Sequence, residues 1–593
     1  MGRNMCKSQN LCKGAMVILI WNGFSALATV YDSDGSSTNI QYIHDSLAQN
    51  GDTITLPAGT FTWSTPVTIS KAIKLQGEGS GRIIGDTKTS TMIGTGLKTF
   101  ETTRSGLPIS VGQTLRVAKM PGNNQPARDA YMEGTVTSYS GTTLEMNVTS
   151  AGGLGTWTFW WIATQPTTTI INNYNNGQPN NPGATPMLKI QQTTAGSAEI
   201  SRIQFIAAPT SVSSIVGIRA DAYAMLDTLV HDCWFETGNG SNGAAIYSDS
   251  NKAVVWNCSF DDTYQLSGTE AFQLKATHGV MDASWSTNST MGTDDVNGAN
   301  NFYIEDCDFH AKKQVCDADD NSRVVIRHCV WDNSQFANHG ADTSNIGTRH
   351  CEIYDNELIF DVFPGNCATE IDLQHAIWIR GGTGIITDNV LPRIESMCAG
   401  TKQNISFSVL NTRRNSGAYC CWVGYPAPHQ VGQGYGPGAV FRDWIGCQGQ
   451  SADYYIYAEP IYVWNNAGTG GNLIGLTQDG TDACGNNQQV SDYVQEGRDY
   501  VIGPKPGYQK LTYPHPLRSG APSPTPTATP TPAPTSTPDP SPTPTVPPSP
   551  TPTATATPMP TPSPSPTSTA SPTPTATPRH TPKPHPSHGP YQG

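Results

Sequence analysis

The sequence predicts an all-β fold in which one chain winds into a single-stranded parallel β-helix. Three observations predict it: a six-residue unit that recurs through the middle of the chain, a composition rich in Gly, Asn, Thr and Ser with only 14% charged residues, and a helix-then-strands pattern near the N-terminus. A chain of 593 residues is longer than one ordinary core fills, so it forms either several domains or one elongated repeat with unfolded ends. The recurring unit favours the second alternative.

The N-terminal segment predicts a secreted protein. Three basic residues precede an apolar stretch, residues 15–27, which ends in the A-x-A pattern of a signal-peptidase site at residues 26–28. We therefore expect residues 1–28 to be a signal peptide. A retained membrane anchor is the weaker alternative, because the apolar stretch is short and is interrupted by Asn22 and Gly23. No other apolar run is long enough for a bilayer, so no membrane span is expected after signal removal.

The C-terminal segment differs in composition from the rest of the chain. From residue 521 to 578 it consists of repeated Thr-Pro and Ser-Pro with very few apolar residues other than alanine. Such a segment cannot bury a core. We expect residues 521–593 to be a disordered Pro/Thr/Ser-rich tail, an extended spacer that associates the preceding domain, residues 29–520, with a cell wall or joins it to another module.

The charge balance of the chain indicates which classes of partner are unfavourable. The chain has 34 basic and 47 acidic residues, a formal charge of −13, and no Lys/Arg-rich run. This balance argues against nucleic acid or an anionic membrane surface as a partner. An anionic substrate would require a local basic patch.

The recurring unit has the form apolar-x-polar-Cys/Asn-x-apolar. It occurs as VHDCWF, VWNCSF, IEDCDF, IRHCVW, IYDNEL and ITDNVL. The residues in its fourth place are Cys233, Cys258, Cys307, Cys329, Asn356 and Asn389. The steps between them are 25, 49, 22, 27 and 33 residues, so each step matches one β-helix coil if the longest carries an insertion. Strand alternation turns the fourth residue inward, which predicts a Cys/Asn ladder inside the coils.

Three states are open to the ladder cysteines: packed thiols, disulfides between coils, and a zinc site. Equivalent residues on stacked strands lie about 4.8 Å apart, where a buried thiol packs as a small apolar group, so packed thiols are favoured. No CxxC-type spacing supports zinc. Disulfides are expected instead among cysteines of the C-terminal half, which are Cys367, Cys398, Cys420, Cys421, Cys447 and Cys484.

The start of the predicted domain supports the same fold. Residues 39–79 indicate a short amphipathic helix, a Gly-Asp turn and three short strands broken by Pro-Ala-Gly, Ser-Lys and Gly-Glu-Gly. This segment closely resembles the N-terminal cap and first coils of pectate-lyase-like proteins, which implies a right-handed parallel β-helix. A helix there would cover the open end of the stack, where unpaired backbone invites edge association.

Residues 109–161 depart from the coil pattern and predict a small antiparallel β insertion with a Ser-Gly hairpin turn. Trp157, Trp160 and Trp161 lie in it. Two roles are open to these rings: stacking on sugars, or packing the insertion against the coils. We expect packing to be the more common role in such an insertion.

The segments "NHGADTSNIGTRHCEIYDN", "IWIRGGTGIITDN" and "GRDYVIGPKPGYQKLTYPHPL" extend the resemblance, to a group of uncharacterised bacterial right-handed β-helix proteins, over most of residues 38–517. The superfamily includes lyases and hydrolases of acidic polysaccharides. The resemblance therefore implies that substrate class without defining a reaction.

A second strand precedes each ladder position, in "AAIYSDS", "AFQLKATH", "QVCDADDN", "NHGADTS" and "HAIWIRGG". Stacking these segments aligns Asp249, Lys275, Asp317 or Asp319, His339 and Arg380 on consecutive coils. A row of basic and acidic side chains along a groove is suited to binding carboxylated sugars and moving a proton.

The predicted chemistry is β-elimination on a uronate polysaccharide. Arg380 or Arg349, or Ca²⁺, would neutralise the uronate carboxylate, and Lys275 or His339 would remove the C5 proton. Further residues are expected to contact substrate or Ca²⁺: Asp249, Asp342 and Trp378 for substrate, and Asp317, Asp319 and Asp320 for the metal.

Simpler roles compete with each of these assignments. Lys275 and His339 are also residues that turns commonly contain. The three aspartates would equally form an acidic surface turn. The two arginines would equally form structural ion pairs with Asp342 and Asp372.

Two motif sets are missing. The Asn-Thr-Asp, Gly-His-Gly and Arg-Ile-Lys set of polygalacturonases is absent, as is the Arg-x-Pro-x-x-Arg segment of many pectate lyases. The leading prediction is therefore a secreted polysaccharide lyase of unspecified type. The alternatives are a non-catalytic glycan-binding surface protein and a glycoside hydrolase with paired carboxylates.

Overall fold

The computed structural model describes residues 28–519 except for several internal segments. Those segments are 120–129, 173–186, 192–195, 208–217, 222–226, 238–243, 250–251, 263–269, 276–300, 311–313, 320–321, 333, 339–347, 360–375, 392–406, 411–430, 435–439, 446–450, 469–473, 478–479, 482–486 and 489–493. The predicted signal peptide, apart from Ala28, and the predicted tail lie outside the described residues, as do the six cysteines expected to form disulfides. In the described part of the chain, no helix combines the length and apolar character needed to cross a membrane.

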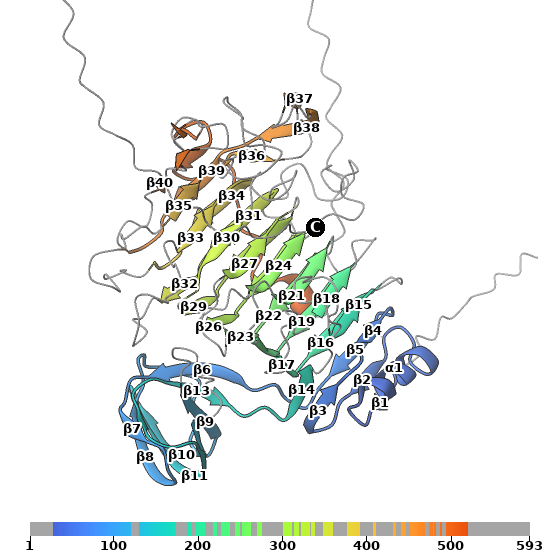
Figure 1. Ribbon diagram of the computed structural model, residues 1–593, viewed down its shortest axis with the longest axis vertical. Helices are drawn as coiled ribbons and strands as arrows, with labels where there is room; N and C mark the ends of the chain where they lie inside the picture. The colour runs from blue at the N-terminus through green and yellow to red at the C-terminus, as the bar shows by residue number, and fades with distance from the viewer. Residues whose placement is uncertain are drawn as a thin grey trace, which may run out of the picture. The chain divides into compact units, whose positions relative to one another are not determined.

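Three long sheets, parallel throughout, form the body of the described chain (Figure 1). Sheet A contains, in spatial order, β1 (Val30–Asp32), β2 (Thr53–Thr55), β5 (Lys74–Gln76), β16 (Ala198–Ser201), β19 (Asp227–His231), β22 (Lys252–Trp256), β25 (Phe302–Glu305), β28 (Arg323–Arg327), β31 (His350–Tyr354), β34 (Thr383–Thr387), β39 (Ile461–Trp464) and β43 (Tyr500–Ile502). Sheet B contains β3 (Gly59–Trp63), β14 (Thr168–Asn172), β17 (Gln204–Ala207), β20 (Trp234–Thr237), β23 (Ser259–Asp262), β26 (Asp308–His310), β29 (Val330–Asp332) and β32 (Glu357–Ile359). Sheet C contains β4 (Val67–Ile69), β15 (Leu188–Ile190), β18 (Ile218–Asp221), β21 (Ala244–Asp249), β24 (Glu270–Lys275), β27 (Gln314–Ala318), β30 (Phe336–Asn338), β33 (Ile377–Ile379), β35 (Phe407–Leu410) and β40 (Ile474–Thr477).

From β15 to β32, each coil contributes one strand to each sheet, in the order C, A, B, whereas the described coils from β33 onward have no strand in sheet B. Strands β24, β25 and β26 form one such coil, and β27, β28 and β29 pair with them as the next. The 49-residue step is a single coil, because Ser259 pairs directly with Asp308 and the extra residues fall between β24 and β25. The predicted single-stranded parallel β-helix is confirmed.

The Cys/Asn ladder forms at the bend between sheets A and B. All six predicted side chains are buried, and the described ladder cysteines are free thiols, as predicted. In the Asn part of the ladder, the Nδ2 of Asn356 donates to Oδ1 of Asn389 at 3.0 Å, and the Nδ2 of Asn389 donates to Oδ1 of Asn466 at 2.9 Å. These amides satisfy one another along the stack, which allows polar groups in the core.

The residue before each ladder position has left-handed backbone geometry. Asp232, Asn257, Asp306 and His328 have φ angles of 52°, 52°, 50° and 55°. Asn and Asp adopt this region more readily than most residues, which explains the polar third place of the repeat. The bend therefore recurs because the sequence supplies a suitable residue on each coil.

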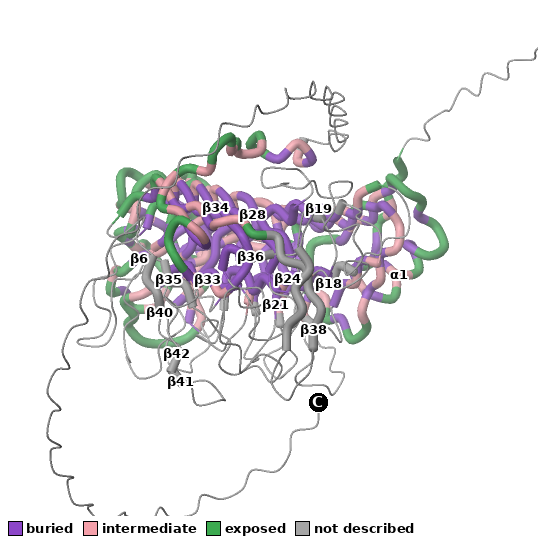
Figure 2. The backbone as a smooth tube through the Cα atoms, turned by 90° about the horizontal axis from the view of Figure 1, so that it is seen from above, coloured by how far each residue is buried: buried purple, intermediate pink, exposed green. Residues whose placement is uncertain are grey.

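Apolar side chains stack in register inside the coils. Phe205, Phe235, Phe260 and Phe309 lie on successive strands of sheet B with neighbouring ring centroids 5.0, 5.0 and 5.2 Å apart. Figure 2 shows the buried residues gathered along the strands of the coils. The core is thus a continuous column that each coil extends.

The N-terminal cap is α1 (Ser37–Ser46), which the sequence predicts. The Oγ of Ser36 accepts a hydrogen bond from the backbone N–H of Asn39, and Ile40 and Ile43 are buried on the side that packs on the first coil. The following segment forms four strands rather than the expected three, because Pro66 separates β3 from β4 and lets the chain turn from sheet B to sheet C.

An antiparallel sheet interrupts the second bend between sheets A and B, between β5 and β14. It contains β6 (Arg82–Thr87), β13 (Trp160–Thr164), β9 (Thr114–Lys119), β10 (Tyr131–Ser140), β11 (Thr143–Gly152) and β8 (Gly96–Glu101), with β7 (Thr91–Met92) pairing to β12 (Thr156–Trp157) beside it. This insertion sheet begins at Arg82, earlier than the predicted range 109–161, because β6 and β8 pair antiparallel with β13 and β11. Short antiparallel pairs also occur near the C-terminal end: β36 (Gln433–Gly434), β38 (Ser451–Ala458), β37 (Val440–Ile445), β41 (Gly480–Thr481) and β42 (Asn487–Gln488).

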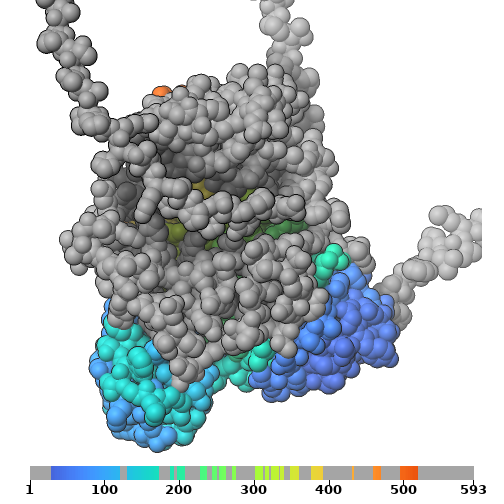
Figure 3. All heavy atoms as spheres, in the orientation of Figure 1, coloured from blue at the N-terminus to red at the C-terminus, as the bar shows by residue number. Residues whose placement is uncertain are grey.

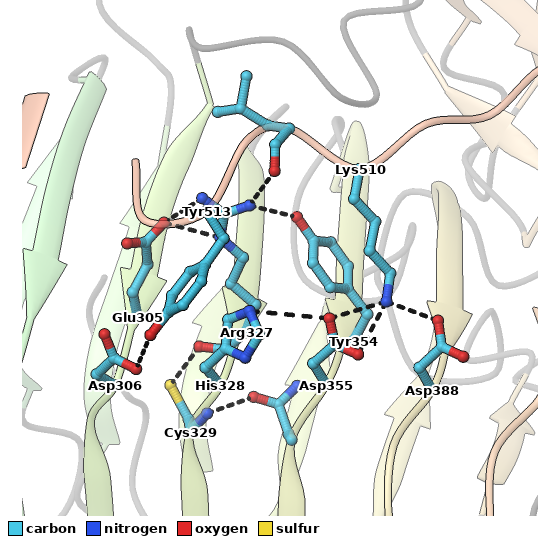
Figure 4. A network of polar contacts seen from close by, with 12 residues as sticks. Glu305, Asp306, Arg327, His328, Cys329, Tyr354, Asp355, Asp388, Lys510 and Tyr513 are labelled. Carbon is cyan, nitrogen blue, oxygen red and sulfur yellow. Dashed lines mark hydrogen bonds and ion pairs between the residues drawn. The ribbon is translucent and has the colours of Figure 1, made fainter. Parts of the chain in front are cut away.

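The last described residues, 503–519, form a C-terminal strap over the outer face of sheet A and end in the 3-10 helix η5 (Pro516–Ser519). Its Tyr508 hydroxyl donates to Glu352 at 2.6 Å, and its Lys510 Nζ lies 2.8 Å from Asp355. Figure 4 shows further contacts from the strap to polar side chains on neighbouring strands of sheet A. The strap therefore ties several coils together.

Candidate functional site

The predicted row of charged residues lies at the ends of successive strands of sheet C. Asp249 pairs in register with Lys275, and the backbone N–H of Asp319 donates to the carbonyl of Leu274, which places Asp319 beside Lys275 on the next coil. Arg380 directly follows β33, whose Trp378 pairs with Ala337. For the described residues of the row, the register of the strands thus agrees with the alignment made from the sequence.

Lys275 and Asp319 interact directly. The Nζ of Lys275 lies 3.4 Å from Oδ2 of Asp319, with a quarter of the lysine side chain exposed and the aspartate buried. On the face that sheet C occupies in Figure 1, Figure 3 shows atoms of the green and yellow parts of the chain at the surface. The cation of this pair is therefore the more accessible partner.

Arg380 is held by the coil before it. Its backbone N–H donates to the Oδ1 of buried Asn338 at 2.7 Å, its Nε donates to the Asn338 carbonyl, and its guanidinium carbon lies 4.9 Å from the ring centroid of Trp378. A guanidinium over an indole ring gains cation–π stabilisation and keeps a defined orientation. Arg380 and Trp378 thus form one preorganised unit, three coils from Lys275 or about 14 Å along the stack at about 4.8 Å per coil.

Arg349 occupies a different environment. It is buried just before β31, and its Nη1 donates to the Oγ1 of Thr383 at 3.0 Å. The structure does not bring it into the row with Lys275 and Arg380.

Of the remaining predicted residues, some are described by the structure and some are not. Asp317 is a buried outward residue of β27 that pairs in register with Gln273. His339, Asp342 and Asp320 lie outside the described residues. Among the residues that are described, no group of three His, Cys, Asp or Glu side chains is arranged to hold a metal ion, so the Ca²⁺ site stays a prediction.

A second polar column, not predicted from sequence, lies on the outer face of sheet B. Glu236, Asp261, His310 and Asp332 pair in register on four successive coils, and all but Asp332 are buried. The Nδ1 of His310 lies 3.4 Å from Oδ2 of Asp332, and its ring centroid is 5.9 Å from that of Trp161. The insertion sheet covers this face, so residues far apart in sequence meet there.

A pocket of about 110 Å³ opens between sheet B and the insertion sheet. Its polar lining consists of Arg116 from the insertion sheet and Gln204, Glu236 and Asp261 from sheet B. A few convergent polar groups on an otherwise apolar lining are typical of small-ligand sites.

The three tryptophans of the insertion have different environments. Trp160 is fully buried in the core of the insertion sheet, and Trp157 is partly exposed with Lys119 Nζ 3.7 Å from its ring centroid. Trp161 lines the pocket and packs with Trp234 of sheet B. Packing against the coils, the expected role, therefore holds for Trp161.

The sequence carries a signal for this second column. The residue that follows each of the first four repeat units is Glu236, Asp261, His310 and Asp332 in turn. Strand alternation turns that place outward, so extending the repeat by one residue would have revealed the column. Only the path of the insertion shows that the face is covered.

Comparisons with known proteins return structural likeness alone. No protein-family model matches the chain, and no curated protein matches it. Similar solved structures include an alginate lyase from Paenibacillus sp. str. FPU-7 (9% identity, TM-score 0.28, covering 62% of this chain and 90% of that one) and a tailspike of Pseudomonas phage phi297 (11%, 0.14, 68% and 78%). A tailspike of Acinetobacter baumannii bacteriophage AP22, in complex with a capsular saccharide, is a third (10%, 0.14, 60% and 72%). With TM-scores this low, the fold assignment rests on the strand pairing of this chain.

Proposed function

We propose that this protein is a secreted carbohydrate-active β-helix protein that binds an acidic, uronate-containing polysaccharide along the outer face of sheet C and cleaves it by β-elimination. The observation that carries the proposal is the register of Asp249, Lys275 and Asp319 on three neighbouring coils, with Arg380 two coils beyond Asp319. A polymer lying along the stack would meet these side chains in turn.

Charge on the row supports an anionic polymer despite the net charge of −13. Arg380 presents a planar guanidinium, which pairs with a carboxylate in bidentate fashion and stays charged. The Trp378 ring beneath it adds an apolar surface for a sugar face. Together they would bind one uronate unit.

The pairing of Lys275 with Asp319 bears on which residue is the base. A neighbouring carboxylate stabilises the ammonium form of a lysine, which suits neutralisation of a uronate carboxylate, whereas a base must be uncharged. We therefore assign Lys275 to charge neutralisation and proton abstraction to His339. Ca²⁺ at Asp317, Asp319 and Asp320 would add to neutralisation.

The test is an assay of the full secreted chain on a panel of uronate polysaccharides, with Ca²⁺ and with a chelator. β-Elimination produces unsaturated uronate ends, which absorb in the ultraviolet. Reducing ends without that absorbance would indicate hydrolysis, and retention on a glycan column without either product would indicate a glycan-binding surface protein; each result would overturn the lyase proposal.

Two lysine variants separate charge from proton transfer. Lys275→Arg keeps the cation and should retain most activity, whereas Lys275→Met should raise KM. His339→Gln should reduce kcat by about 10²–10⁴-fold, the usual contribution of a general base. Equal loss in Lys275→Arg and Lys275→Met would assign the base to Lys275 instead.

A further inference from the structure

The pocket beneath the insertion sheet differs chemically from the row on sheet C. Two buried carboxylates, Glu236 and Asp261, face it from neighbouring strands, and one cation, Arg116, faces it from the insertion sheet. The Nε of Arg116 lies 3.3 Å from Oε1 of Glu133, and its guanidinium carbon lies 4.1 Å from the ring centroid of Tyr131. The arginine charge is thus largely compensated, and the pocket repels anions.

The carboxylates are held in place by neighbouring side chains. The indole Nε1 of Trp234 donates to Oδ2 of Asp261 at 2.8 Å, and the Nε2 of Gln204 donates to Oε1 of Glu236. The Oε1 of Gln204 in turn accepts a hydrogen bond from the Oγ1 of Thr169 at 2.8 Å. Fixed carboxylate oxygens make strong hydrogen bonds with hydroxyl donors.

The other walls of the pocket are aromatic and aliphatic. Trp161 comes from β13 and Trp234 from β20, and both pack with Ile83 and Ala163. Indole rings provide large, rigid apolar surfaces. A ligand suited to this pocket therefore has an apolar face, hydroxyl donors on its edge and no negative charge.

We propose that this pocket is a second carbohydrate site, which binds an uncharged sugar ring with its hydroxyls on Glu236 and Asp261 and its face on Trp161 or Trp234. The site is independent of the row on sheet C and has the opposite preference for charge. Such a site would bind neutral units of a mixed polymer, or a neutral side branch, on another face of the coils.

The experiment uses saturation-transfer NMR and tryptophan fluorescence with the full secreted chain. The probes are the methyl glycosides of glucose, galactose, mannose and N-acetylglucosamine, with methyl glucuronoside as the charged counterpart of the glucoside. We expect at least one neutral glycoside to receive saturation and to change the fluorescence, and the glucuronoside to do neither.

Variants identify the site. Asp261→Asn and Glu236→Gln should each weaken binding by about tenfold, equivalent to about 1.4 kcal/mol, and should lessen discrimination against the glucuronoside. Trp161→Leu should lessen the fluorescence change, and circular dichroism checks that each variant is folded. Lys275→Met, on sheet C, should leave neutral glycoside binding unchanged.

Three outcomes would overturn the proposal: no saturation of any neutral probe, equal binding of the glucuronoside, or loss of binding in Lys275→Met with Glu236→Gln unaffected. Uronate cleavage by the Glu236→Gln variant at the wild-type rate would show that the two sites are separate. Failure of the lyase assay would leave the neutral-sugar result interpretable, because the two readouts do not depend on each other.

Discussion

Arg327 and Glu305 form an ion pair between neighbouring strands of sheet A in which both side chains are completely buried. The Nε of Arg327 donates to Oε1 of Glu305 at 2.7 Å, and its Nη1 donates to the hydroxyl of Tyr354 at 3.0 Å (Figure 4). The second carboxylate oxygen of Glu305 accepts from the Nη1 of Arg518 in the strap at 2.9 Å. The pair therefore links two coils to the strap.

Removing one partner of this pair should strongly destabilise the fold. Arg327→Met would leave the Glu305 carboxylate buried without its main partner, so we expect a loss of about 3–5 kcal/mol in the free energy of unfolding, measured by urea denaturation. Lys74→Met is the control, because Lys74 pairs with Glu199 at 2.8 Å while half exposed and should cost at most about 1 kcal/mol. Equal costs for the two variants would mean that the buried pair is not a structural link.

The Asn part of the ladder should tolerate substitution less well than the Cys part. Asn389 donates to Asn466 and to the carbonyl of Ile353, and accepts from Asn356. Asn389→Ala leaves several buried polar groups unsatisfied, at about 1–3 kcal/mol for each. Cys258→Ala removes only a packed sulfur and should cost about 1 kcal/mol, near the average for point mutations. Urea denaturation of both variants tests this order, and a greater loss in Cys258→Ala would contradict it.

The described cysteines should not react in the folded protein. Burial raises the pKa of the Cys351 thiol to about 12, helped by the nearby Glu352 carboxylate, so the reactive thiolate is scarce at pH 8. Burial raises the pKa of Cys307, but hydrogen bonds with the Cys258 and Cys329 thiols outweigh it and lower that pKa. Every ladder cysteine is nevertheless buried beyond the reach of the reagent. We therefore expect iodoacetamide to label Cys351 and the ladder cysteines only after unfolding, as mapped by peptide mass spectrometry. Rapid labelling of native protein at these positions, or their recovery as disulfides, would contradict the packed-thiol structure.

His231 should make stability depend on pH in the alkaline range. Burial lowers the pKa of His231, but hydrogen bonds to Asp232 and Glu199 outweigh it and raise the pKa to about 9. The unfolded value is about 6.5, so the stabilisation is complete below pH 6.5 and is lost as the pH rises toward 9. Compared with wild type, His231→Gln should therefore be less stable at pH 6 and nearly equal at pH 9.5. Thermal unfolding at the two pH values measures this difference, and a gap that does not close with pH would rule out His231 as its source.

The sequence by itself determined the fold class, the ladder and the sheet-C row, because each is a periodic property. Cys233 and Asn389 recur in the same place of a local unit, and stacked parallel strands convert that recurrence into contact between equivalent residues. The cap is likewise local, since α1 follows from its apolar spacing and the N-cap Ser36.

Only the tertiary structure decided which faces of the coils are covered and which charges meet. Glu236 and Trp161 line the same pocket only because the insertion sheet folds back over sheet B. The strap brings Arg518 to Glu305 across 213 residues. No periodicity encodes these contacts, because they depend on the direction in which an insertion or a terminal segment leaves the repeating coils.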